Sequence, residues 1–485
     1  MAGHGDAREF VLDTLVVAIA QVLLRLRGLV LLPLIVKLLG TASYGTFSQV
    51  IAVSGLAAAL LAFNLHLALV RFMVGDRDRW GSIYVSLLGA TAISVGVGGG
   101  LLALFADSMG AVLIGGVDGS TYLKLALALV FTANVRQINV NVYRATGRFA
   151  TRSIVELVTV LGELLGMYVV IRLGYGLRAA FELAVVWELA AAVLTTAHVL
   201  VLTGWGRPDL GIVRDGLAFS LPLLPISLGV WALDRADRLV LNAYLGARAV
   251  GIYSASYMLA TFVLIFQFPF QQTLFPKVSG LWDKDRRAAE RYISLSSRVF
   301  LTVAIPFTAG ATALAPPILA WLGNAEIAAE SGRITFLLTA GVLLWGVATM
   351  IMQALYAARR TVALGALMLV GAAVNVVLNF ALVPRWGVVA AAANTLVAYA
   401  LVVAGLVVLV GRVAHVSYDL GYLAKCVAAA AAMAALLWLV APRSPAALLA
   451  GTAAGAVVYA LFLLALRAFS AEDWTNVRRL LSRRR

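Results

Sequence analysis

A chain of 485 residues that is 62% hydrophobic, with a mean hydropathy of +0.96, is more apolar than a soluble domain, in which about half of the residues are apolar. Apolar runs of 20 residues or more recur from Phe10 to Arg467, and each can cross a bilayer core of about 30 Å, so the composition excludes a soluble globular protein. The net charge of +15 is therefore expected in loops beside anionic lipid and not on a nucleic-acid surface, and the single cysteine, Cys426, excludes an intramolecular disulfide.

In chain order, fourteen membrane spans are predicted. They lie at about residues 10–38, 44–70, 82–106, 120–143, 151–172, 178–203, 212–233, 247–275, 292–316, 332–357, 361–383, 387–410, 421–440 and 446–467. The predicted fold class is an all-α polytopic membrane protein with about 14 transmembrane helices, and no connection is long enough for a separate domain of about 50 residues. No signal-peptide cleavage site follows the first span, which is expected to be retained.

Lysine and arginine residues concentrate in alternate loops, beginning with the loop at 71–81. The positive-inside rule then predicts a multi-pass protein of the cell (inner or plasma) membrane with both termini in the cytoplasm. In the tail, residues 469–485, apolar side chains fall on one helical face and arginines on the other. This pattern predicts a basic amphipathic helix that lies on the inner leaflet.

One phrase of the sequence occurs twice, with glycine, aromatic and serine residues in the same order. Gly40, Gly45, Phe47 and Ser48 correspond to Gly246, Gly251, Tyr253 and Ser254, an offset of 206 residues. Two further pairs, YRATGR with YAARR and LGYGLRAA with PRWGVVAA, repeat at offsets of 213 and 211. The duplication predicts an N-terminal lobe of six helices at 1–205 and a second at 206–411, followed by two C-terminal spans at 412–468. Parallel lobes of this kind are expected to enclose a cleft and to work by alternating access.

Charged and amide side chains inside the predicted spans mark a candidate site, because an ionisable group at mid-bilayer costs about 2.5–3.5 kcal/mol on insertion scales. They are four arginines, Arg25, Arg27, Arg136 and Arg298, three amides, Asn139, Asn375 and Asn379, and three carboxylates, Glu156, Glu163 and Glu188. Arginine offers a planar fork of donors to phosphate oxygens, so the arginines and amides predict a cleft that binds a pyrophosphate.

Two interpretations of these charges stay open. Arg25 and Arg27 point about 200° apart on a helix, so we expect Arg25 to face the cleft and Arg27 to pair with a carboxylate. The carboxylates are candidates for proton or sodium coupling. In the alternative interpretation the arginines pair with the carboxylates and simply hold helices together. A further pair, Asp234 with Arg238, is expected to stabilise a turn at the outer end of the seventh span.

Three segments, LLPLIVKLLGTASYGTFS, DRADRLVLNAYLGARAVGIYSASYMLA and RRTVALGALMLVGAAVNVVLNFALVPRWGVVAAAANTLVAYA, resemble the polysaccharide-export (Wzx-type, O-antigen) flippases of the MOP superfamily, which includes the MATE exporters. The resemblance covers about residues 10–410. It implies a MATE-like fold and translocation of an isoprenoid-pyrophosphate-linked oligosaccharide from the cytoplasmic to the outer leaflet by alternating access. A polysaccharide polymerase is a candidate partner, and a monomer is favoured.

Other functions are weighed against this one. A lipid II flippase also handles a pyrophosphate, and a MATE-like exporter of cationic drugs is expected to have a more acidic and aromatic cleft. A membrane enzyme is expected to show catalytic motifs in a sizeable loop, and no GxSxG, HExxH or nucleotide-binding glycine loop occurs. The sequence therefore predicts a transporter without a cofactor, other than a coupling ion, and without a metal site.

Overall fold

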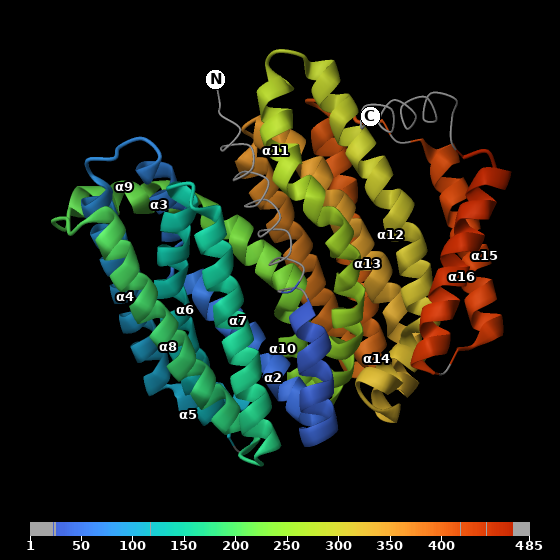
Figure 1. The fold of residues 1–485 in the computed structure, drawn as a ribbon, viewed down its shortest axis with the longest axis horizontal. Coiled ribbons are helices and arrows are strands. Elements are labelled where there is room, and N and C mark those ends of the chain that lie inside the picture. The colour runs from blue at the N-terminus through green and yellow to red at the C-terminus, as the bar shows by residue number, and fades with distance from the viewer. Residues whose placement is uncertain (1–22, 24–25, 117, 418, 443, 469–485) are drawn as a thin grey trace. The chain divides into compact units, whose positions relative to one another are not determined.

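The computed structural model describes residues 23, 26–116, 118–417, 419–442 and 444–468, and all regular structure in these ranges is helical (Figure 1). Residues 26–39 form a helix that precedes the labelled elements. These are α2 (Thr41–Leu61), α3 (Leu65–Met73), α4 (Trp80–Leu104), α5 (Ala106–Leu113), α6 (Gly119–Ala145), α7 (Phe149–Arg172), α8 (Gly176–Thr203), α9 (Leu210–Ser220), η1 (Leu221–Leu223), α10 (Leu224–Thr261), η2 (Phe262–Gln267), α11 (Phe268–Trp282), α12 (Arg286–Leu322), α13 (Ala325–Ala357), α14 (Thr361–Gly411), α15 (Leu420–Val440) and α16 (Pro445–Ala465).

The described residues contain 11 helical segments that are long and apolar enough to cross a membrane. Two of them, Leu210–Gln267 with 58 residues and Thr361–Gly411 with 51, far exceed the roughly 20 residues that one crossing needs. Each is interrupted by a glycine with non-helical backbone angles, Gly246 or Gly387, so each supplies two spans. Together with the helix at 26–39, this arrangement confirms the predicted polytopic all-α fold.

The duplicated phrases form the same backbone turns. Gly40 has φ 89° and ψ 169°, and its counterpart Gly246 has φ 77° and ψ 176°. Gly176 and Gly387, from the other repeated pair, also have positive φ angles of 79° and 61°. Residues other than glycine rarely adopt such backbone angles, so the repeated glycines are required where one span ends and the next begins.

A second repeated turn differs in its central residue. The amide of Arg148 donates to the carbonyl of Tyr143 at 2.8 Å, and the amide of Arg360 donates to that of Leu355 at 2.9 Å. Both bonds close the same helix-ending motif, in which the penultimate residue has a positive φ. That residue is Gly147 in the first copy, with φ 74°, but Arg359 in the second, with φ 57°.

Replacing Arg359 with glycine is expected to raise the free energy of unfolding by up to about 1 kcal/mol, because it relieves the left-handed backbone penalty of a side chain. Arg359 is exposed, so no packing is lost. Thermal unfolding in detergent measures the gain. Arg360→Gly is the matched control, since φ is −93° at that position and glycine gains nothing there. An equal change in both variants would contradict the explanation.

The chain forms two compact units. The first comprises the described residues of Met1–Ser254 and Met368–Ala391, and the second those of Ala255–Leu367 and Ala392–Arg485. The first unit contains both copies of the duplicated turn phrase, at 40–48 and 246–254. That the lobes at 1–205 and 206–411 are the parts of the protein that move during transport stays a prediction.

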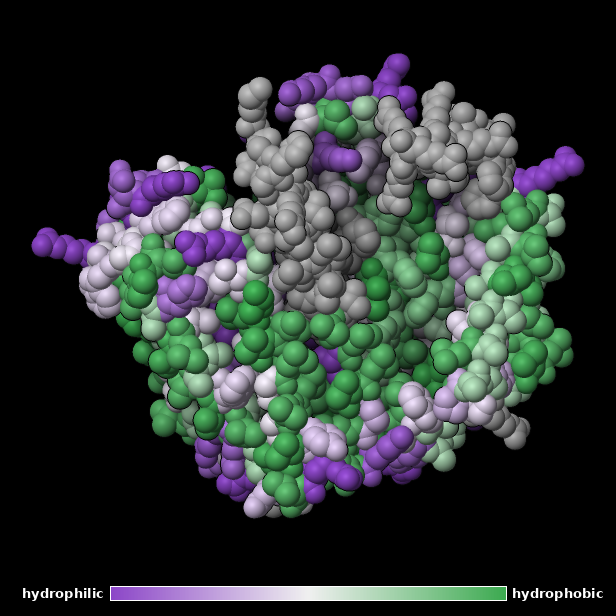
Figure 2. All heavy atoms as spheres, viewed as in Figure 1, coloured by the Kyte–Doolittle hydropathy of each residue, from purple (hydrophilic) through white to green (hydrophobic). Residues whose placement is uncertain are grey.

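Each unit has an apolar core and an apolar outer surface. In the first unit Leu69, Tyr84 and Tyr143 are buried where α3, α4 and α6 meet, and in the second Cys426 and Leu437 lie in the core that α15 forms with α12 and α16. Figure 2 shows hydrophobic side chains over the middle of the helices and hydrophilic ones mainly at their ends. Such a surface is suited to lipid, in which only helices and closed sheets satisfy the backbone polar groups.

Side-chain caps fix where several helices begin. The side chains of Asp209, Asp285, Asn324, Asp419 and Ser444 each accept a hydrogen bond from a backbone amide in the first turn of the following helix. Capping satisfies amides that have no partner within the helix. In the sequence, these five residues therefore mark the points where α9, α12, α13, α15 and α16 begin.

Candidate functional site

Two arginine–glutamate pairs lie inside the first unit. Arg27 Nη2 is 2.5 Å from Glu163 Oε1, and Arg136 Nε is 2.6 Å from Glu188 Oε1. The first pair joins the helix at 26–39 to α7, and the second joins α6 to α8. The side chains of Arg136 and Glu188 are only 17% and 10% exposed, so this pair is largely removed from the surroundings.

The two pairs form one cluster. Glu163 lies within electrostatic range of Arg136 and Glu188 as well as of its own partner Arg27. The cluster, which we call the paired-charge site, therefore consists of Arg27, Arg136, Glu163 and Glu188. Its two positive and two negative charges cancel, and each arginine retains donors that its carboxylate does not use.

The pairing expected for Arg27 is confirmed, and Arg136 follows the alternative interpretation in which it pairs with a carboxylate. The third carboxylate, Glu156, is bonded to Arg152 one turn earlier on α7, at 3.1 Å. Arg25, the arginine expected to face the cleft, lies outside the described residues, as does the tail at 469–485. Contact of any of these side chains with a substrate stays a prediction.

Asn139 is fully buried among three helices of the first unit. Its oxygen accepts a hydrogen bond from Tyr84 of α4 at 2.7 Å, and its nitrogen donates to Thr195 and Thr196 of α8 at 2.9 Å. The side chain therefore joins α6 to α4 and α8. This network explains how a polar residue is accommodated at this position, and contact between Asn139 and a substrate stays a prediction.

Asn375 and Asn379 share one face of α14, as their spacing predicts, and both are fully buried. Asn379 Nδ2 donates to Asn375 Oδ1 at 3.1 Å, whereas Asn375 Nδ2 has no hydrogen-bond partner. A buried donor without a partner is costly, so this amide is an exception among the buried polar groups of α14.

Arg298 belongs to the second unit and lies against a C-terminal helix. Its guanidinium carbon is 4.1 Å from the centre of the Tyr422 ring of α15, a distance typical of a cation–π contact. Contact between Arg298 and a pyrophosphate stays a prediction.

The expected end of the seventh span at residue 233 is wrong, because α10 continues as a helix to the turn at Gly246. The charges at 234–238 therefore lie within the helix. Asp237 is 1% exposed and accepts hydrogen bonds from Arg238 and from the hydroxyl of Tyr253. Arg238 donates to the backbone carbonyl of Asp234 at 2.5 Å. The Asp234 carboxylate instead lies 3.0 Å from Arg235.

The two copies of the turn phrase pack directly against each other. A Cβ atom on Gly45 would lie 1.7 Å from the carbonyl oxygen of Ala247, and one on Gly251 would lie 2.2 Å from that of Thr41. Residues 41 and 45 correspond to 247 and 251 in the repeat, so the contact is symmetric. We call this contact between α2 and the second half of α10 the glycine crossing.

Two amide side chains fasten the end of α5 beside the glycine crossing. Gln49 of α2 donates to the carbonyl of Leu113 at 2.5 Å, and Asn242 of α10 donates to that of Ile114 at 2.9 Å. Neither residue was predicted from the sequence. A glutamine within the apolar run of α2 was the available signal. Its partner is a backbone carbonyl on another helix, and the residue types in a sequence do not indicate such a partner.

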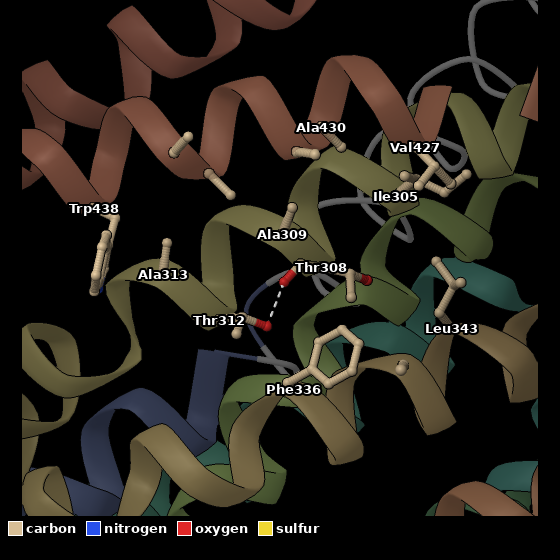
Figure 3. A pocket seen from close by; sticks show the side chains of 14 residues that line it. Ile305, Thr308, Ala309, Thr312, Ala313, Phe336, Leu343, Val427, Ala430 and Trp438 are labelled. Carbon is tan, nitrogen blue, oxygen red and sulfur yellow. Dashed lines mark hydrogen bonds between the residues drawn. The ribbon is translucent and has the colours of Figure 1, made fainter. Parts of the chain in front are cut away.

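The second unit contains a pocket of about 670 Å³ between α12, α13 and α15. Figure 3 shows Phe336 and Trp438 at its edges and alanines along its wall, and the Thr312 hydroxyl donates to the Thr308 carbonyl at 2.8 Å. The pocket is almost entirely apolar. Among the described residues, no group of three or more histidine, cysteine, aspartate or glutamate side chains could hold a metal ion.

Comparison with known families gives matches over more than half of the chain. Residues 10–282 match the family model described as polysaccharide biosynthesis protein. The chain belongs to the polysaccharide biosynthesis protein family. Residues 153–459 also match the model of the lipid II flippase MurJ. The membership confirms the resemblance to Wzx-type flippases of the MOP superfamily, and this family member is a multi-pass membrane protein.

Two curated relatives of this family member come from Haloferax volcanii. The probable low-salt glycan biosynthesis flippase Agl15 is 23% identical over 59% of this chain and 59% of its own length. The probable flippase AglR is 27% identical over 34% of this chain and 35% of its own length. The matched region thus spans less than two thirds of either relative.

Solved structures show the same fold. The lipid II flippase MurJ in an inward closed conformation aligns with a TM-score of 0.78 and 14% identity, over 93% of this chain and 99% of that one. An inward-facing multidrug resistance MATE family transporter of the MOP superfamily aligns with a TM-score of 0.61 and 12% identity, over 80% of this chain and 95% of that one. The polysaccharide biosynthesis protein family member therefore has the MurJ- and MATE-like fold.

Proposed function

We propose that this protein is a flippase that moves an isoprenoid-pyrophosphate-linked oligosaccharide from the cytoplasmic to the outer leaflet, with both termini in the cytoplasm. The observation that supports it best is the paired-charge site, which places two arginines from different helices within one cluster. Family membership and the names of the Haloferax volcanii relatives agree with a glycan substrate.

In the proposed mechanism the carboxylates hold the arginines while the carrier is empty. An unpaired arginine would be costly in this setting, and Glu163 and Glu188 remove that cost by pairing. An incoming pyrophosphate offers several charged acceptor oxygens and replaces the carboxylates as the partner of Arg27 and Arg136. Each displaced carboxylate then needs a new counter-charge, for which a proton or a sodium ion is sufficient.

In this proposal the chain performs transport and no covalent chemistry, and the released glycan is passed to a polysaccharide polymerase. Lipid II is the second candidate substrate, because residues 153–459 match the MurJ family model. Both substrates share a lipid pyrophosphate, so the paired-charge site would serve either one, and the sugars would decide between them.

The substrate class is tested with the full chain reconstituted in vesicles. We expect the protein to expose a fluorescent polyprenyl-pyrophosphate oligosaccharide to an external lectin or reductant, and not to transport a lipophilic cation such as ethidium. Flipping of lipid II with comparable or higher rates would favour the second candidate. Transport of ethidium without flipping of either pyrophosphate lipid would refute the proposal.

A further inference from the structure

Three basic residues meet at one end of the second unit, where α15 begins and α16 ends. Arg298 of α12 lies over the ring of Tyr422, the third residue of α15. Lys425, one turn further along α15, donates from Nζ to the carbonyl of Arg467, which follows α16, at 3.1 Å. Arg298 of α12 and Lys425 of α15 therefore lie near the point where Arg467 follows α16.

Hydroxyl groups connect this basic end to the helices below it. Thr302 donates to the carbonyl of Arg298 at 2.7 Å and lies 2.7 Å from the Tyr422 hydroxyl. Tyr459 of α16 donates to the carbonyl of Thr302 at 2.8 Å. Asp419 accepts from the amide of Tyr422 at 2.9 Å and so caps α15.

A pocket of about 420 Å³ begins at these hydroxyls, since Thr302 and Tyr459 line it. Apart from Thr452, the rest of its wall is apolar, with Phe307 and Ile318 of α12, Leu437 of α15 and Ala456 of α16 among the lining residues. From Thr302 to Ile318 the α12 helix rises about 24 Å. One leaflet of the hydrocarbon core is about 15 Å thick, so the pocket is long enough for an acyl chain.

We propose that this pocket, with Arg298, Lys425 and Arg467 at its end, is a binding site for an anionic glycerophospholipid of the cytoplasmic leaflet. The phosphate would lie at the basic end, and one acyl chain would extend along α12. Charge complementarity selects this occupant, because the cytoplasmic leaflet is rich in anionic lipid. Neither Thr302 nor Tyr459, whose hydrogen bonds connect this pocket to Arg298 and Tyr422, lines the larger pocket in Figure 3, so that pocket offers no comparable argument.

The site is separate from the paired-charge site, which lies in the first unit. Its ligand would be a resident lipid that joins α15 and α16 to α12. The proposal therefore does not depend on the identity of the transported glycan.

The test uses the delipidated full chain in a neutral detergent. Phosphatidylglycerol is expected to raise the thermal unfolding temperature and to remain bound in native mass spectrometry, whereas phosphatidylcholine is expected to do neither. Arg298→Gln should reduce the shift with phosphatidylglycerol to that with phosphatidylcholine. Ala456→Phe, which fills the pocket without removing a charge, should do the same.

Matched controls separate the site from general effects. Arg333→Gln removes an exposed cation from α13, and Val457→Phe adds the same bulk beside Ala456 on a 57% exposed position outside the pocket lining. Both should keep the full shift. Equal stabilisation of wild type by the two phospholipids, an unchanged shift in both site variants, or displacement of phosphatidylglycerol by equimolar polyprenyl phosphate would overturn the proposal.

Discussion

Arg136→Gln is expected to abolish glycan export and to destabilise the protein by about 3–5 kcal/mol, because it leaves Glu188 buried without its partner. Glu188→Gln should be destabilising for the reciprocal reason. The double variant Arg136→Gln/Glu188→Gln removes both charges and is expected to recover most of the stability but none of the export. Complementation of a flippase-deficient strain measures export, and thermal unfolding with the amount of protein in the membrane measures stability.

This double variant separates the two interpretations of the paired-charge site. If Arg136 only holds helices together, a stable neutral pair should restore export. If it binds the pyrophosphate, export should stay lost, and Arg136→Lys should recover only part of it because a lysine lacks the planar fork of donors. The control is Arg178→Gln, which breaks an exposed pair with Glu182 at 2.8 Å and should leave export and thermal unfolding nearly unchanged.

Gly45→Ala and Gly251→Ala are each expected either to prevent folded protein from accumulating or to yield a folded protein that no longer transports its substrate. An added methyl group at Gly45 would fall 1.7 Å from a backbone oxygen and at Gly251 2.2 Å, and neither oxygen can move without displacing its helix. Overpacking against side chains typically costs about 1–3 kcal/mol, and a rigid backbone neighbour raises that cost. Protein yield, thermal unfolding and export measure the effect.

Gly89→Ala is the matched control for the glycine crossing. Gly89 also lies within a membrane helix, α4, but a methyl group there meets nothing within 4 Å. Alanine is about 0.5–1 kcal/mol better than glycine inside a helix, so this variant should be neutral or slightly more stable. Normal yield and export from Gly45→Ala would show that α2 and α10 separate more easily than the contact indicates.

Much of the fold was predictable because its signals are local. Apolar runs are long enough to identify each span, and Gly40 and Gly246 identify a turn that only glycine forms readily. The end of the seventh span was not predictable in the same way. Asp237 and Arg238 suggest a water-facing helix end, but they neutralise each other and Asp237 also accepts a hydrogen bond from Tyr253, which allows both to stay inside α10.

The candidate site was predictable in composition but not in pairing. The sequence identifies Arg27, Arg136, Glu163 and Glu188 as charges within apolar spans. Which carboxylate meets which arginine depends on the rotation and packing of helices that lie 136 and 52 residues apart along the chain. The same reason explains why Gln49 and Asn242 were missed, since both bond to backbone carbonyls that every sequence contains.

The symmetry of the glycine crossing has a consequence for the history of the chain. Residue 45 of one copy meets residue 247, and residue 251 meets residue 41, which is the reciprocal pattern of an isologous interface between two identical subunits. A chain formed by fusion of two such subunits inherits this interface in covalent form. In such a dimer one substitution would alter both sides together, whereas a fused chain allows Thr41 and Ala247 to differ. A transporter that moves its substrate in one direction gains from that freedom, because its two halves no longer need to be alike.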